Sequence, residues 1–267
     1  MKKQRKLLLI GMVGVFLILM GWNTGFSAES PNAESPKENA GNSEVLRLPA
    51  QTSSPYTDSY TAAGRFSLGL SGFLGQGIDD IDVGKAENGK TISISGGGGV
   101  GGALTLGFDF SSNTGIDVSI GMQHSVLSPK VSNMEGSFNR TFLLSTVKYK
   151  IPVHMFSHPS QVNIGCGIGY YIPGKLDIDG SKVTNGGEHD IVEYDSAIGM
   201  HIIGEYEVFF VEGWSFMVGI KYSAVKYDAN SVKRDGDSYP VAAITNGKVR
   251  ELDGSGIDLI LGVARYF

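Results

Sequence analysis

The sequence is poor in cysteine, in charge and in long apolar runs. Its one cysteine, Cys166, excludes an internal disulfide framework and a cysteine-rich metal site. Charged residues make up 18% of the chain, against about 25% in ordinary soluble domains. With 22 Lys and Arg against 27 Asp and Glu, the net charge is −5, so the basic surface of a nucleic-acid-binding protein is absent. No nucleic-acid partner is expected.

Glycine and aromatic residues are abundant instead. There are 38 glycines among 267 residues, about twice the ordinary share, and they show no Gly-X-Y period. Aromatic residues reach 10%, too many for a disordered chain. This composition favours a glycine-rich β protein.

The first 28 residues have the layout of a secretory signal peptide. A basic start at residues 2–6 precedes an apolar run at 7–20 and small residues before position 28. As a helix the run would span about 21 Å, short of the roughly 30 Å hydrocarbon core, which argues against an uncleaved anchor. We therefore predict a signal peptide over 1–28, a flexible periplasmic arm over the polar residues 29–62, and a barrel domain over 63–267.

Eight segments alternate apolar and small or polar residues with period two. They cover residues 66–72, 104–110, 116–122, 143–151, 162–170, 198–210, 214–222 and 257–267. Such alternation predicts strands with two unlike faces, in a soluble β-sandwich or in a membrane barrel. Ten residues at a tilt of about 40° rise about 25 Å, the height of an outer-membrane apolar band.

Three features favour the barrel over the sandwich. The more apolar face lacks the charges that a solvent-facing surface needs. Short turns near 111–115, 152–161 and 211–213 alternate with long polar loops near 75–99, 125–139, 172–194 and 226–254. Aromatic residues gather at both ends of the strands, as interfacial girdles do. The predicted fold is an all-β, closed antiparallel eight-stranded transmembrane β-barrel with up-and-down topology.

The chain resembles the small eight-stranded outer-membrane β-barrel proteins, the group that includes OmpW and the OmpA transmembrane domain. The resemblance rests on the signal segment, residues 165–171 (GCGIGYY), 204–206 (GEY) and the ending 262–267 (GVARYF). It implies an outer-membrane location with both termini periplasmic, contact with outer-membrane lipid and lipopolysaccharide, and assembly by the barrel-assembly machinery. The implied assembly signal is Phe267, Val263, Leu261 and Leu259. Arg265 departs from that pattern, and at the periplasmic rim it could snorkel.

The inward residues divide by depth. A charge network is expected toward the periplasm, formed by Arg65, Asp109, Asp117, Lys148, Glu205 and Glu207. An apolar upper lumen is expected from Phe142, Leu144, Ile203 and Ile260. Because an eight-stranded lumen is just wide enough for side chains to fill, opposite charges there should pair and plug it.

Enzymatic and metal chemistry find little support. Gly96, Gly98 and Gly101 fit G-x-G-x-x-G, but without the strand and helix that a dinucleotide site needs. The aspartates at 79–82 and 177–179 do not complete a calcium loop, so no metal is expected. His124 and Ser125 point to opposite faces, and inward His201 could meet Glu205 or Glu207 without a serine nearby. We expect no enzyme, no catalytic residue and no cofactor.

The predicted role is structural, surface-exposed or small-solute passage. A channel for small hydrophobic molecules, as the OmpW resemblance would imply, is the alternative. A lipid-modifying enzyme is a more distant one.

Overall fold

The computed structural model describes residues 63–85, 89–153, 158–180, 188–244 and 246–267. The predicted signal peptide and arm lie outside the described residues. Within these ranges no helix is long and apolar enough to span a membrane.

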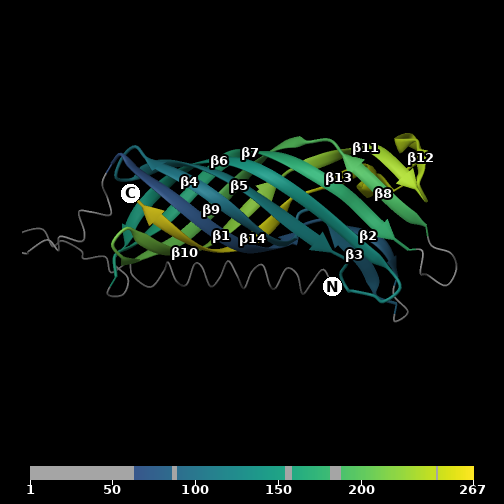
Figure 1. Ribbon diagram of the computed structural model, residues 1–267, viewed down its shortest axis with the longest axis horizontal. Coiled ribbons are helices and arrows are strands. Elements are labelled where there is room, and N and C mark those ends of the chain that lie inside the picture. The colour runs from purple at the N-terminus through teal and green to yellow at the C-terminus, as the bar shows by residue number, and fades with distance from the viewer. Residues whose placement is uncertain (1–62, 86–88, 154–157, 181–187, 245) are drawn as a thin grey trace, which may run out of the picture. The chain divides into compact units, whose positions relative to one another are not determined.

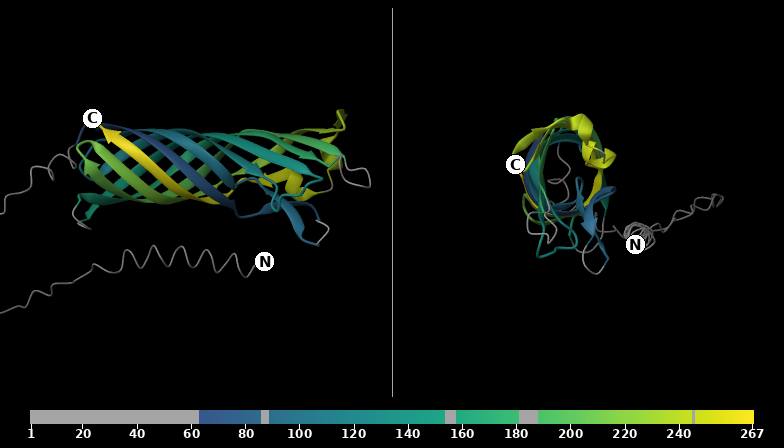
Figure 2. Two further views of the ribbon diagram at one scale, coloured as in Figure 1. Left: turned by 60° about the horizontal axis from the view of Figure 1, so that its bottom comes forward. Right: turned by 90° about the vertical axis from the view of Figure 1, so that its right-hand side faces the viewer.

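Eight of the described strands form a closed antiparallel ring, seen from the side in Figure 1 and end-on in Figure 2. In ring order they are β1 (Arg65–Gly77), β4 (Gly99–Asp109), β5 (Thr114–Val126), β6 (Glu135–Val153), β7 (Ser160–Asp179), β9 (Ala197–Val211), β10 (Trp214–Ala224) and β14 (Gly256–Tyr266). The pairing of β14 with β1 closes the ring. Each alternating segment overlaps one of these strands, so the predicted fold is confirmed.

One end of the ring carries the short turns and the C-terminus. Short connections join β4 to β5, β6 to β7 and β9 to β10 there. At the same end β1 begins, with Arg65 opposite Asp109 and Ser67 opposite Tyr266. We call this the short-turn end, and the opposite end the long-loop end.

The described residues of the long-loop end form further strands, which the prediction of polar loops missed. β2 (Asp80–Lys85) and β3 (Thr91–Ser95) form a hairpin. β8 (His189–Tyr194), β11 (Lys226–Arg234) and β12 (Asp237–Tyr239) extend the sheet from β7. β13 (Glu251–Asp253) pairs with β11, and η1 (Val241–Ala243) and α3 (Gly247–Arg250) lie between β12 and β13. We call β8, β11 and β12, with the continuing ends of β6 and β7, the loop-end sheet.

Apolar packing between the loops stabilises the strands at the long-loop end. Phe138 and Tyr227 are 1% and 0% exposed, and their ring centroids lie 6.1 Å apart. Ile81, Ile94 and Leu252 belong to the same buried cluster. Apolar residues alternate in these loops only over short stretches, such as residues 91–95 (TISIS), which are shorter than the segments that predict the barrel strands.

Candidate functional site: the barrel lumen

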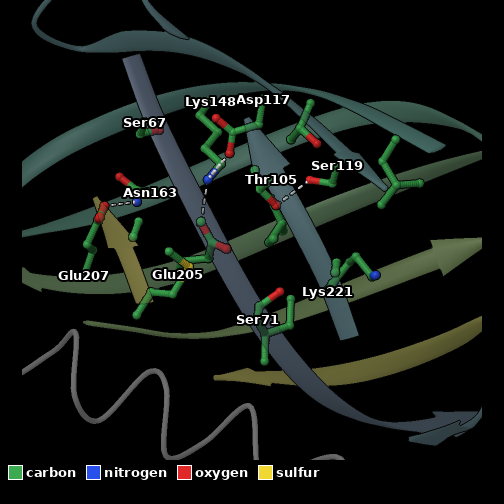
Figure 3. A pocket seen from close by; sticks show the side chains of 18 of the residues that line it. Ser67, Ser71, Thr105, Asp117, Ser119, Lys148, Asn163, Glu205, Glu207 and Lys221 are labelled. Carbon is green, nitrogen blue, oxygen red and sulfur yellow. Dashed lines mark hydrogen bonds and ion pairs between the residues drawn. The ribbon is translucent and has the colours of Figure 1, made fainter. Parts of the chain in front are cut away.

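The lumen encloses a cavity of about 60 Å³ between two unlike walls (Figure 3). Small hydroxyl residues from β1, β4 and β5 form one wall, among them Ser67, Thr105 and Ser119. Large charged residues from β6, β9 and β10 form the other wall, because only long side chains can fill the space opposite small ones. A water needs about 10–15 Å³ of such volume, so the cavity has room for a few waters.

Lys148 holds a three-residue ion cluster in the wall of the cavity. Its Nζ lies 2.5 Å from Asp117 Oδ2 and 2.8 Å from Glu205 Oε2. The three residues come from β6, β5 and β9, and the side chains are only 5–14% exposed. One ammonium therefore ties three strands together across the lumen, and each buried carboxylate has its counter-charge.

Asp109 and Arg65 lie nearer the short-turn end. Asp109 pairs with Lys150, a cation that the predicted network left out. Lys150 is two residues from Lys148, so the strand alternation alone places it in the lumen. Arg65 stacks over the ring of Tyr266, with its guanidinium carbon 4.5 Å from the ring centroid.

Glu207 is held by neutral donors. Oε1 accepts hydrogen bonds from Ser215 Oγ at 2.5 Å and Tyr266 Oη at 2.7 Å. Oε2 accepts hydrogen bonds from Gln161 Nε2 at 2.7 Å and Asn163 Nδ2 at 2.9 Å. Glu207 is 1% exposed, and four hydrogen bonds replace the water that a buried carboxylate loses. The bonds link β9 to β7, β10 and β14.

An apolar layer follows in the middle of the lumen. Its predicted members, Phe142, Leu144, Ile203 and Ile260, all line the cavity. Phe73 joins them, and Lys221 Nζ lies 5.0 Å from the Phe73 ring centroid and 4.7 Å from that of Phe142. The same ammonium is 3.2 Å from Asp258 Oδ2. The layer is therefore apolar in part and carries a buried ion pair.

Arg140 is buried toward the long-loop end of the barrel. Its Nε donates to Gln123 Oε1 at 2.7 Å, and its Nη1 donates to the carbonyl of Gly254 at 2.5 Å. Arg140 lies on β6, and Gly254 lies just before β14. In the ring of eight strands β14 is directly opposite β6. Gln123 Nε2 in turn donates to Asp258 Oδ1 at 3.0 Å. This buried chain of hydrogen bonds, here called the Arg140 bridge, joins opposite walls.

A glycine segment lies against the Arg140 bridge. A Cβ at Gly97 would overlap the carbonyl of Ser255, and Gly99 has φ +111°. Only glycine fits so close to another backbone or adopts this φ without strain. The three glycines of the G-x-G-x-x-G match are packed as closely. A Cβ would lie 2.7 Å from the Asp253 carbonyl oxygen at Gly96 and 2.9 Å from the Gly77 nitrogen at Gly98, and it would overlap the Met122 carbonyl oxygen at Gly101.

The outside of the ring is a continuous apolar surface. Large apolar side chains that point outward are between 37% and 77% exposed, for example Leu70, Ile120, Ile168 and Ile198. A surface of this kind is stable only against lipid, and a closed ring leaves no backbone group unpaired there. The chain is a closed eight-stranded antiparallel β-barrel with the apolar outer surface of a membrane-spanning barrel.

Comparison with known proteins gives only distant likenesses. No family model and no curated protein matches the chain. Among solved structures, the barrel is similar to the outer membrane protein OprG from Pseudomonas aeruginosa, with 12% identity, TM-score 0.46, and coverage of 77% of this chain and 96% of that one. It is also similar to Neisserial surface protein A (12%, 0.45, 76% and 99%) and to a major outer membrane protein from Thermus thermophilus (13%, 0.48, 77% and 100%). Such distant likenesses say nothing of a shared activity.

His201 and His124 each contact a neutral polar side chain of another strand. His201 Nε2 lies 2.8 Å from Thr146 Oγ1, and not against Glu205 or Glu207. His124 points outward and contacts Asn139. Cys166 is exposed on the outer face. Within the described ranges no three His, Cys, Asp or Glu residues are grouped to hold a metal ion.

The residues of the implied assembly signal share one face of β14. Phe267, Leu261 and Val263 are 67%, 52% and 39% exposed, and Leu259 is half-buried on the same side. Arg265 is exposed between Val263 and Phe267.

Proposed function

We propose that the protein is a closed outer-membrane barrel with a structural and surface-exposed role, which anchors the loop-end sheet and does not conduct ions. The observation that carries this proposal is the Arg140 bridge. It crosses the lumen between opposite walls, while the Lys148 cluster fills the other end.

Charge balance supports a closed lumen. Five cations (Arg65, Arg140, Lys148, Lys150 and Lys221) face five carboxylates (Asp109, Asp117, Glu205, Glu207 and Asp258), so the named ionic side chains sum to zero. The lumen therefore carries no net charge from these side chains that would attract ions of one sign.

The proposed orientation follows from the connections. Short turns are periplasmic and long loops extracellular in barrels of this class, which places the C-terminus in the periplasm and the loop-end sheet outside the cell. A signal peptide over 1–28, contact with lipopolysaccharide around the long-loop end, and assembly by the barrel-assembly machinery belong to the same proposal.

Planar-bilayer recording tests the closed lumen. The unmodified protein should give no stable, porin-like conductance. Arg140→Ala should open the mouth and produce at least brief current steps when combined with Lys148→Ala. Lys226→Ala is the matched control, because Lys226 pairs with Glu251 on the exposed surface. Large, stable currents through the unmodified protein would contradict the proposal.

A second candidate is passage of small hydrophobic molecules. The apolar lining by Leu144, Ile203 and Ile260 favours it. If the barrel passes such molecules, proteoliposomes with the unmodified protein should take up an apolar probe, and Ile203→Trp, which fills the cavity, should abolish this uptake. If the barrel is closed, the unmodified protein should give no uptake. A lipid-modifying activity, the third candidate, would appear as phospholipid or lipid A turnover by the purified protein.

A further inference from the structure

Arg265 is a cation on the lipid-facing side of the last strand. It stands opposite Leu68 of β1 and Trp214 of β10, and it follows the outward residues Leu261 and Val263 of its own strand. A guanidinium on the lipid face costs about 2–4 kcal/mol at the bilayer midplane and about 0–1 near the interface. Arg265 lies two residues before Phe267 and opposite Trp214, the first residue of β10, so it is at the short-turn end of the barrel, where the cost is that of the interface.

Two aromatic rings hold the guanidinium in place. Its central carbon lies 5.3 Å from the ring centroid of Trp214 and 5.4 Å from that of Phe267. Cation–π contacts within about 6 Å are attractive, and they orient the planar group while leaving its edge free to donate hydrogen bonds.

The described residues offer this cation no carboxylate. The salt bridges of the described residues do not include Arg265, although the lumen cations Lys148, Lys150 and Lys221 each have an acidic partner. An oriented, exposed guanidinium without an acid has its donors available to an anion from outside the protein.

We propose that Arg265, Trp214 and Phe267 form a binding site for the headgroup phosphate of a phospholipid. The site faces lipid at the level where headgroups lie, and a guanidinium donates two parallel hydrogen bonds to phosphate oxygens. In the orientation proposed above, the lipid belongs to the periplasmic leaflet. The assignment of the leaflet alone rests on that proposal.

Solid-state NMR on the full barrel tests the contact. With ¹⁵N-labelled arginine in phosphatidylethanolamine–phosphatidylglycerol bilayers, one guanidinium signal should be dephased by lipid ³¹P and should vanish in Arg265→Gln. The same signal should persist in Arg234→Gln, whose guanidinium pairs with Asp190 outside the membrane. If the Arg265 signal shows no ³¹P dephasing, the proposal is wrong.

Native mass spectrometry tells whether the site binds the phosphate of a lipid headgroup or free inorganic phosphate. From a phosphate-free detergent, the barrel should retain phosphatidylglycerol, and Arg265→Gln should weaken retention by about tenfold, with Arg265→Lys between them because it keeps the charge and loses the paired hydrogen bonds. Inorganic phosphate at equal concentration should not compete. Competition by inorganic phosphate would reduce the site to a free anion site and overturn the lipid assignment.

The barrel-assembly machinery is the rival partner for this surface. If Arg265→Gln slows only machinery-assisted assembly and leaves lipid retention and ³¹P contact unchanged, the proposal is likewise wrong. Conductance is a separate readout, so a conducting barrel with a phosphate-bound Arg265 would refute the closed lumen and keep the lipid site.

Discussion

Replacing Lys148 by methionine should destabilise the barrel by about 3–5 kcal/mol. Methionine keeps most of the volume but leaves Asp117 and Glu205, which now flank one ammonium at 2.5 and 2.8 Å, without a counter-charge. Two carboxylates about 5 Å apart repel by about 3 kcal/mol at an effective dielectric constant of about 20. Their lost pairing adds to this repulsion.

Urea unfolding in lipid vesicles measures this effect. Trp214 is the only tryptophan left once residues 1–28 are removed, so its fluorescence follows the transition. Lys175→Met is the control, because the Lys175–Glu193 pair is exposed at 61% and 40% and should not move the midpoint. Adding Asp117→Asn and Glu205→Gln to Lys148→Met should recover most of the loss.

The refuting result is clear-cut. If Lys148→Met costs less than about 1 kcal/mol and the triple variant is no more stable, the cluster does not hold the lumen together. The triple variant distinguishes two causes of the lost stability. The two amide substitutions remove the charge repulsion and restore stability, whereas a packing defect at residue 148 would persist in the triple variant.

Three further outcomes are expected. The hydrogen bond from His189 to Asp177 raises the pKa of the His189 imidazole, so the ion pair stabilises the loop-end sheet fully below about pH 6.5 and is lost as the pH rises through the raised pKa; an NMR titration midpoint that stays unchanged in Asp177→Asn would contradict this. Deleting Phe267 should lower the folded fraction on gels far more than deleting residues 30–60, and equal fractions would refute the assembly signal. Intact-mass measurement on outer-membrane fractions should find a chain that starts near residue 28, and a retained Met1 would exclude the signal peptide.

The sequence predicted the ring because alternation is local. Each membrane strand carries its own apolar face, so residues 104–110 or 116–122 reveal a strand without knowledge of their neighbours. The same alternation placed Phe142, Leu144, Ile203 and Ile260 in the lumen, where they line one cavity.

Which side chains bond to each other was harder to predict than which side of a strand each residue faces. Alternation says that Asp109 points inward, but its choice of Lys150 depends on the tilt and stagger of strands that are distant in the sequence. The Arg140 bridge depends on a backbone carbonyl more than a hundred residues away, for which no side-chain pattern exists. The four neutral donors around Glu207 come from three other strands.

The loop-end sheet was missed for a related reason. Its apolar residues are buried by one another across separate loops, so their burial emerges only when the loops are assembled.

The unbroken run of β6 and β7 gives the molecule a mechanical property. Both strands pass from the barrel wall into the loop-end sheet and stay hydrogen-bonded to each other on the way, with one irregularity in register near Asn139. No flexible linker separates the two parts on these strands. A pull or a push on the tip of the sheet is therefore transmitted as a lever to the whole barrel, which must tilt in the bilayer rather than let the tip swing alone.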